Sequence, residues 1–70
     1  MKVSVNLKLL RGLRETRSKS VSDLSYYLGY KTPTAYWLLE QGNRNMSIEV
    51  LWKLSKLYGK TMEELLITDE

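Results

Sequence analysis

The chain has 70 residues and a net charge of +3, and it contains neither cysteine nor histidine. A chain of this length forms one domain with a small core, and without cysteine or histidine it lacks disulfides, the thiolate and imidazole metal ligands and the commonest general base. No apolar run approaches the length of a membrane span, and basic residues interrupt any segment that could serve as a signal peptide. We therefore expect a single cytoplasmic domain over residues 1–70 that does not meet a membrane. We also expect it not to be an enzyme and to take no cofactor, metal or small-molecule substrate.

The first predicted element is an amphipathic helix over residues 6–17. Its leucines recur at helical spacing, and its arginines lie on another side, which we interpret as a solvated face with DNA contact as the alternative. These residues are Leu7, Leu10 and Leu13 on the apolar side and Arg11, Arg14 and Arg17 on the basic side. Gly12 lies in the helix interior, where close packing or simple tolerance must explain it. In residues 1–5 two valines alternate with polar residues, a pattern too short to predict a strand.

Residues 20–42 are the most informative part of the chain, because they predict two short helices joined by a tight turn. Ser20 can cap the first helix, residues 21–28, and Asp23 stands at its third position, which completes a capping box. Gly29 then supplies the permissive backbone that a helix needs to end. One helical face carries Val21, Leu24, Ser25 and Leu28.

The second of these helices is predicted over residues 33–41. Thr32 offers a capping hydroxyl, Pro33 occupies the first turn, where its missing N–H costs nothing, and Gly42 ends the helix. A helix, a glycine, a short turn and a second helix are the sequence form of a helix-turn-helix. The second helix of that motif usually reads DNA in the major groove.

Two more helices are predicted in the C-terminal third of the chain. One begins after Ser47 and ends at Tyr58, and the other covers residues 62–67, where Thr61 and Glu64 form a second capping box. Together these elements predict an all-α, five-helix domain. Its expected core is drawn from all five helices: Leu10, Leu13, Leu24, Leu28, Tyr36, Leu39, Ile48, Leu51, Leu54, Tyr58 and Leu65.

The order of these features resembles the Cro/CI-type (XRE-like) helix-turn-helix family of phage repressors and bacterial regulators. The resemblance covers about residues 7–66 and implies a compact DNA-binding domain. Where the family usually has alanine, this chain has Ser25, which fits if its hydroxyl bonds back to a helix carbonyl. The motifs that carry the resemblance are Leu13-Arg14, Ser20, Leu24, Gly29, Leu39-Glu40-x-Gly42, Arg44-Asn45-x-Ser47, Leu51-x-Lys53-Leu54, Leu57-x-Gly59 and Glu63-Glu64-Leu65-Leu66.

Charge and helix geometry assign candidate contacts to double-stranded operator DNA. Residues 1–31 carry seven basic and two acidic side chains, whereas residues 32–70 carry four basic and six acidic ones, and a basic half suits a polyanion. The residues expected to face the bases from the helix at 33–41 are Thr34, Trp37, Leu38 and Gln41. The residues expected to bind phosphate, two of them placed there by the resemblance, are Tyr26, Lys31, Thr32, Asn43 and Arg44.

The apolar character of the helix at 33–41 leaves a second function open. Trp37 and Leu38 can read thymine methyls, but an exposed pair of this kind is also typical of a protein-binding surface. We therefore predict a sequence-specific transcriptional regulator, most like a phage repressor or Cro. The alternative is an antirepressor or adaptor that binds a partner protein through this helix. A third interpretation, an antitoxin, lacks an evident tail to wrap a toxin.

A homodimer on the operator is also expected, because one such domain covers only a half-site. The helix at 48–58 has a second apolar stripe that either closes the core or meets a partner chain. The expected dimer surface combines this stripe with the C-terminal residues: Val50, Leu57, Met62, Leu66 and Ile67.

Overall fold

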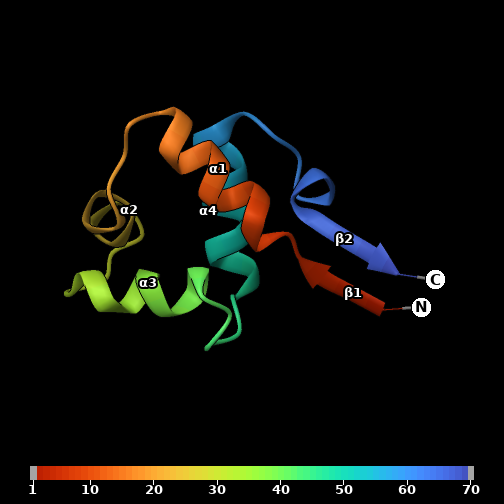
Figure 1. Ribbon diagram of the computed structural model, residues 1–70, viewed down its shortest axis with the longest axis horizontal. Coiled ribbons are helices and arrows are strands. Elements are labelled where there is room, and N and C mark those ends of the chain that lie inside the picture. Colours follow the sequence, from red (N-terminus) through yellow and green to blue (C-terminus); the bar gives the residue numbers. More distant parts are fainter. Residues whose placement is uncertain (1, 70) are drawn as a thin grey trace.

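The computed structural model describes residues 2–69, which form a helical body and a two-stranded ribbon at its side (Figure 1). The elements follow one another as β1 (Lys2–Val5), α1 (Leu7–Thr16), α2 (Val21–Tyr27), α3 (Pro33–Glu40), α4 (Ile48–Tyr58), the 3₁₀ turn η1 (Glu63–Leu65) and β2 (Leu66–Asp69). Within the described range, no helix is both long and apolar enough to cross a membrane.

The predicted ends of the central helices are confirmed with one exception. The Ser20 N–H donates to Asp23 Oδ2 at 2.8 Å, and the Asp23 N–H donates to Ser20 Oγ at 3.0 Å, so the capping box of α2 is present and lowers the pKa of Asp23. Gly29, after α2, has a φ of 88°, a backbone conformation that glycine adopts without steric cost. Thr32 precedes α3 as predicted, but its hydroxyl caps none of the described backbone N–H groups.

The fifth predicted helix and the all-α class are wrong. Over residues 62–67 the chain makes only the turn η1 and then enters β2, which pairs antiparallel with β1. The predicted capping box is formed, with Thr61 N–H to Glu64 Oε1 at 2.9 Å and Glu64 N–H to Thr61 Oγ1 at 3.1 Å. Only one turn follows it because Leu66 takes up extended backbone to pair with β1.

The core lies where the four helices and η1 meet, and most of the predicted core residues are in it. Two residues of α4 differ from expectation: Ile48 is 78% exposed, and Val50 is only 8% exposed. Val50 lies one turn before the fully buried Leu54 and shares its face, whereas Ile48 lies six residues before Leu54 and turns away from it. Leu13 is partly buried against the core. The buried apolar residues are Leu10, Leu24, Leu28, Tyr36, Leu39, Val50, Leu51, Leu54, Tyr58 and Leu65.

Candidate nucleic-acid interface

Helix α3 is fixed to α2 through a serine at the helix contact. The Ser25 hydroxyl donates to the Pro33 carbonyl at 3.1 Å and accepts from the Tyr36 N–H at 3.1 Å. The hydroxyl that was expected to bond a helix carbonyl therefore bonds the first residue of α3. Because Ser25 and Tyr36 are both buried, these bonds hold the start of α3 in one position on α2.

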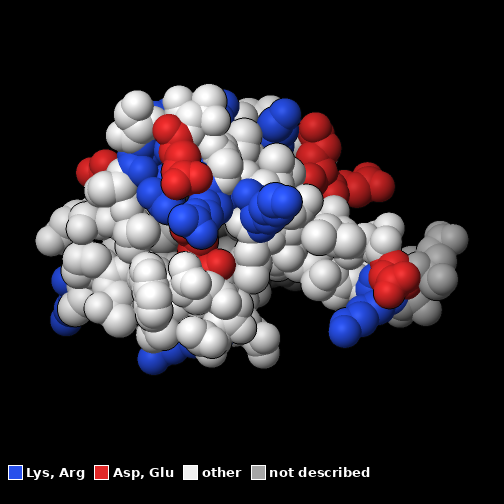
Figure 2. All heavy atoms as spheres, viewed as in Figure 1, with Lys and Arg blue, Asp and Glu red and all other residues white. Residues whose placement is uncertain are grey.

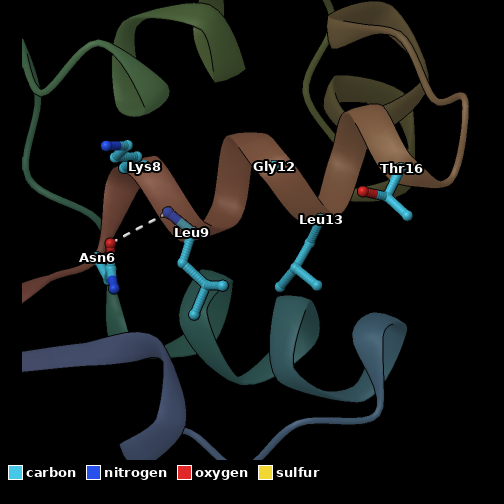
Figure 3. A pocket seen from close by; sticks show the side chains of 6 residues that line it. All are labelled: Asn6, Lys8, Leu9, Gly12, Leu13 and Thr16. Atoms are coloured by element: carbon cyan, nitrogen blue, oxygen red, sulfur yellow. Dashed lines mark hydrogen bonds between the residues drawn. The ribbon is translucent and has the colours of Figure 1, made fainter.

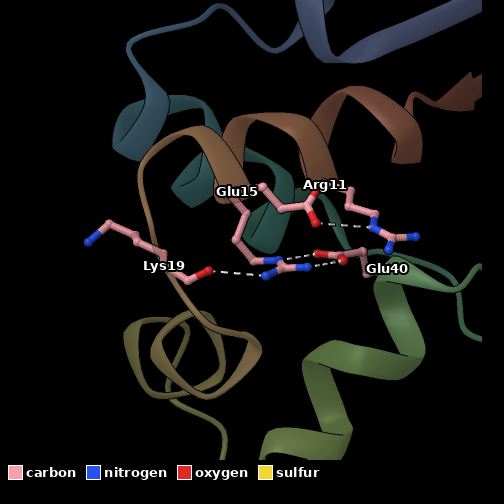
Figure 4. Close-up of polar contacts among 5 residues, drawn as sticks. Arg11, Glu15, Lys19 and Glu40 are labelled. Carbon is pink, nitrogen blue, oxygen red and sulfur yellow. Dashed lines mark hydrogen bonds and ion pairs between the residues drawn. The ribbon is translucent and has the colours of Figure 1, made fainter.

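The other end of α3 is fixed by an ion pair to α1. Arg14 Nε and Nη2 donate to the two carboxylate oxygens of Glu40 at 2.9 and 2.8 Å, and Arg14 Nη1 donates to the Lys19 carbonyl at 3.0 Å (Figure 4). The hydrogen bond to Glu40 raises the pKa of Arg14. Arg14 is thus a structural residue, and its interpretation as part of a solvated face is wrong. Arg14 and Glu40 each belong to a motif that carries the family resemblance. Because they lie 26 positions apart, no local spacing rule predicts that they form an ion pair.

Arg11 on α1 and Arg17, which directly follows the helix, also have partners. Arg17 Nη2 donates to the Tyr58 carbonyl at 3.2 Å, and its guanidinium lies 5.1 Å from the centroid of the Tyr58 ring. Arg11 forms an exposed ion pair with Glu15 at 3.8 Å. Two of these three arginines, Arg14 and Arg17, therefore contact other parts of the fold.

The four predicted base-reading residues come together on the outer side of α3. Thr34, Trp37 and Gln41 are exposed, and Leu38 is partly exposed. Trp37 keeps 46% of its surface exposed, although it neighbours the fully buried Tyr36. This side thus offers one hydroxyl and one amide for hydrogen bonding, beside two apolar side chains.

The predicted phosphate-binding residues flank this side of α3. Lys31 and Thr32 are exposed before the helix, Asn43 and Arg44 are exposed after it, and Tyr26 is exposed on α2. Glu40 is the one acidic residue between positions 29 and 46, and Arg14 neutralises it. In Figure 2 the surface at lower left, where α3 lies, is mostly uncharged, with basic atoms at its margin. Among residues 29–46, therefore, no unpaired carboxylate would repel phosphate.

The predicted dimer residues do not form one exposed surface. Val50 belongs to the core, so its assignment to a dimer surface is wrong. Leu57, Met62 and Leu66 are partly buried and pack against the core. Ile67, on β2, is 46% exposed and is the one residue of the five with a largely exposed side chain.

A helix-turn-helix whose second helix presents polar and apolar side chains between basic ends is the arrangement of a DNA-binding domain. A comparison with known protein families matches residues 9–70 to the Cro/C1-type HTH DNA-binding domain. Because this match covers most of the sequence, the chain belongs to that family, a class of DNA-binding regulators rather than of enzymes. No curated protein sequence matches the chain.

Proposed function

We propose that the chain is a sequence-specific transcriptional regulator, similar to a phage repressor or Cro, that binds operator DNA by placing α3 in the major groove. The orientation of α3 carries this proposal. Its inner side is immobilised by Tyr36, Leu39 and the ion pair of Glu40. The side left to face DNA carries Thr34, Trp37, Leu38 and Gln41.

The chemistry of that side suggests how a sequence would be read. Gln41 can make two hydrogen bonds to the N6 and N7 edge of adenine, and Thr34 can bond either a donor or an acceptor. Trp37 and Leu38 would contact thymine methyls, so we expect an operator rich in A·T pairs under α3. The flanking residues would hold phosphates and set the register, from Lys31, Thr32 and Tyr26 at one end and Asn43 and Arg44 at the other.

A gel shift with the DNA that flanks its own gene, repeated over a salt series, tests the proposal. Binding should weaken steeply with salt, because each phosphate contact releases bound counterions. A selection from random DNA would then identify the operator. If the chain bound no duplex even at about 50 mM salt, the proposal would fall.

The exposure of Trp37 favours a second candidate, a module that binds a partner protein through α3. The two candidates differ in what Gln41 does. If α3 reads DNA, Gln41→Ala changes the preferred base at one operator position. If α3 meets a protein, Trp37→Ala abolishes binding to that protein. Any DNA binding then lacks sequence preference, and Gln41→Ala does not change it.

We further propose that two copies bind a palindromic operator, one on each half-site, because a single domain of this size contacts only a half-site. Ile67 is the residue of the expected dimer surface that is still available for this contact. Sedimentation with and without operator tests the stoichiometry, and one copy per complete operator would contradict it.

A further inference from the structure

A cleft of about 370 Å³ lies between β1 and the loop that joins α3 to α4. Val3, Ser4 and Val5 line it from the strand, and Leu39, Arg44 and Met46 line it from the helical body. The molecule is visibly hollowed between the body and the ribbon (Figure 2). No acidic residue of the described chain lines this cleft. Its walls therefore carry no negative charge, and they combine apolar side chains with the polar Ser4 and Asn45 and one cation, Arg44.

The cleft follows the edge of β1 and not one of its faces. Successive residues of a strand point to opposite faces, so a cleft over one face would be lined by alternate residues. Here the three consecutive residues 3–5 line it, and no residue of β2 does. The cleft therefore runs along the edge of β1 that faces away from β2.

The backbone of this edge has no hydrogen-bond partner among residues 2–69. The Asn6 N–H donates to the Leu65 carbonyl at 2.8 Å, one position beyond the Val5↔Leu66 pair of the ribbon. Because bonding direction alternates along an antiparallel pair, Ser4 directs its N–H and C=O toward β2, and Val3 and Val5 direct theirs into the cleft. The Leu66 N–H bonds the Glu63 carbonyl instead of β1, as this alternation requires.

An open strand edge beside a cleft that exposes apolar side chains is the arrangement that accepts an extended chain as an additional strand. We propose that β1 binds an extended peptide segment of a partner protein by strand addition. Backbone groups of the segment pair with Val3 and Val5, its alternate apolar side chains contact Leu39 and Met46, and an acidic side chain pairs with Arg44.

Charge favours such a segment over a second copy of this chain. A second copy that paired through this edge would present its own β1, whose residues 2–5 include Lys2 and no acidic side chain. Such a pairing would bring a second cation near Arg44 and offer Arg44 no counter-ion. An acidic segment meets the opposite charge there.

Peptide binding has a consequence for DNA, and this consequence rests on the proposed function. Arg44 is proposed to hold a phosphate, so a peptide carboxylate that pairs with Arg44 competes with DNA for it. The segment would thus act as an antagonist of DNA binding. Binding of the peptide itself does not depend on any contact between the chain and DNA.

The experiment titrates the whole chain, without DNA, into a fluorescein-labelled peptide of sequence Thr-Val-Thr-Val-Thr-Asp and follows fluorescence anisotropy. We expect saturable binding in the micromolar range. Two control peptides should bind at least about tenfold more weakly: one with lysine in place of aspartate, and one with proline in place of the second valine, which removes a ladder N–H. Equal binding of all three peptides would overturn the proposal, as would no binding of the first.

Variants of the chain locate the site. Val3→Pro removes an N–H that faces the cleft and leaves the pairing with β2 intact, whereas Val3→Thr keeps that N–H. We expect Val3→Pro and Arg44→Gln each to weaken peptide binding about tenfold, and Val3→Thr and Arg11→Gln to leave it within about twofold. Circular dichroism checks that each variant is folded. If folded Val3→Pro binds as Val3→Thr does, strand addition is excluded.

A second titration, with the selected operator present, distinguishes failure of the strand-addition site from failure of the proposed function. Peptide binding by a chain that binds no DNA supports the strand-addition site and rejects the proposed function. DNA binding without peptide binding rejects the site alone. Sedimentation that shows a dimer lost in Val3→Pro, without peptide binding, assigns the edge to a second copy and overturns the partner segment.

Discussion

Arg14 and Glu40 form a bidentate ion pair, with distances of 2.9 and 2.8 Å, that joins the last turn of α1 to the last residue of α3. The Glu40 side chain is almost completely buried, and that of Arg14 is largely so. The pair thus determines where α3 ends relative to α1, and the residues proposed to read DNA lie on α3. An ion pair in the fold thereby positions an interface that contains neither of its members.

Removing the cation of this pair should destabilise the fold strongly. Arg14→Met leaves the Glu40 carboxylate buried without a counter-ion, so we expect the free energy of unfolding to fall by about 3–5 kcal/mol. Urea denaturation followed by circular dichroism measures the change. Arg11→Met removes an exposed pair and should cost less than about 1 kcal/mol. Similar values for both variants would show that the Arg14 pair contributes little.

Two buried phenols should make the domain sensitive to alkali. The hydroxyls of Tyr36 and Tyr58 have no hydrogen-bond partner among the described residues. Burial, reinforced by the charge of Glu40, raises the pKa of both phenols above the ordinary value. Above the unfolded-state pKa of about 10, the unfolded chain loses protons that the folded chain keeps, so the folded state should lose stability as pH rises.

Thermal unfolding between about pH 8 and pH 11 measures this effect. Tyr36→Phe should flatten the fall in melting temperature and cost little stability at neutral pH, because the lost hydroxyl has no partner to leave behind. The matched control is Tyr26→Phe, at an exposed position, which should keep the slope of the wild type. If Tyr36→Phe followed the wild type throughout, Tyr36 would not be the source of the alkaline sensitivity.

Substitutions of two residues that follow α3, Gln41 and Arg44, should affect DNA binding in different ways. Arg44→Ala removes a proposed phosphate contact, so it should weaken binding to every duplex alike and reduce the salt slope by about 1. Gln41→Ala removes a proposed base contact and should relax the preference at one position by about 1–3 kcal/mol. A salt series on the selected operator and on single-base variants of it distinguishes the two. A uniform loss in both variants would place Gln41 at the backbone.

The parts of the fold set by neighbouring residues were predictable from the sequence. The capping box of Ser20 and Asp23 and the glycine that ends α2 depend on residues three to nine positions apart, and both are confirmed. The Thr61 capping box was also correct, yet the helix inferred from it was wrong. A cap only starts a helix, and here Leu66 pairs with Val5, which lies at the other end of the chain.

The candidate site was predictable in its outline for the same reason. The outer side of α3 follows from helical period alone, and Thr34, Trp37 and Gln41 are exposed as expected. Helical period did not predict which face of α4 is buried, because α4 has two apolar stripes. Packing against the other helices decides which stripe faces the core. The residue that braces α3, Arg14, is joined to it only by tertiary contact and has no local signature.

Two residues of the expected dimer surface, Leu57 and Ile67, should respond differently to substitution by glutamate. Leu57 packs against the core, so Leu57→Glu buries an unpaired carboxylate and should unfold the domain or cost at least about 3 kcal/mol. Ile67→Glu lies on an exposed strand and should cost less than about 1 kcal/mol, while it weakens cooperative binding to a palindromic operator. A folded Leu57→Glu monomer that lost cooperativity would restore Leu57 to the dimer surface.

The two glycines at positions 12 and 42 should respond to alanine with opposite signs. Gly12 lies within α1 beside a shallow hollow. The side chains of Leu9 and Leu13 line this hollow and point toward α4 (Figure 3). A Cβ added there meets no heavy atom within 4 Å. Simple tolerance and not close packing therefore explains this glycine, and Gly12→Ala should stabilise the domain by about 0.5–1 kcal/mol.

Gly42 has the opposite constraints, because its φ is 80° and an added Cβ would lie 3.2 Å from Leu7 Cδ1. Gly42→Ala should therefore cost about 1–2 kcal/mol, from the left-handed backbone and from displacement of Leu7. Thermal melts of both variants beside the wild type measure the two shifts, and the double variant should show their sum if the sites are independent. A destabilised Gly12→Ala would mean that the hollow on α1 is closed in solution by another part of the molecule or by a second copy.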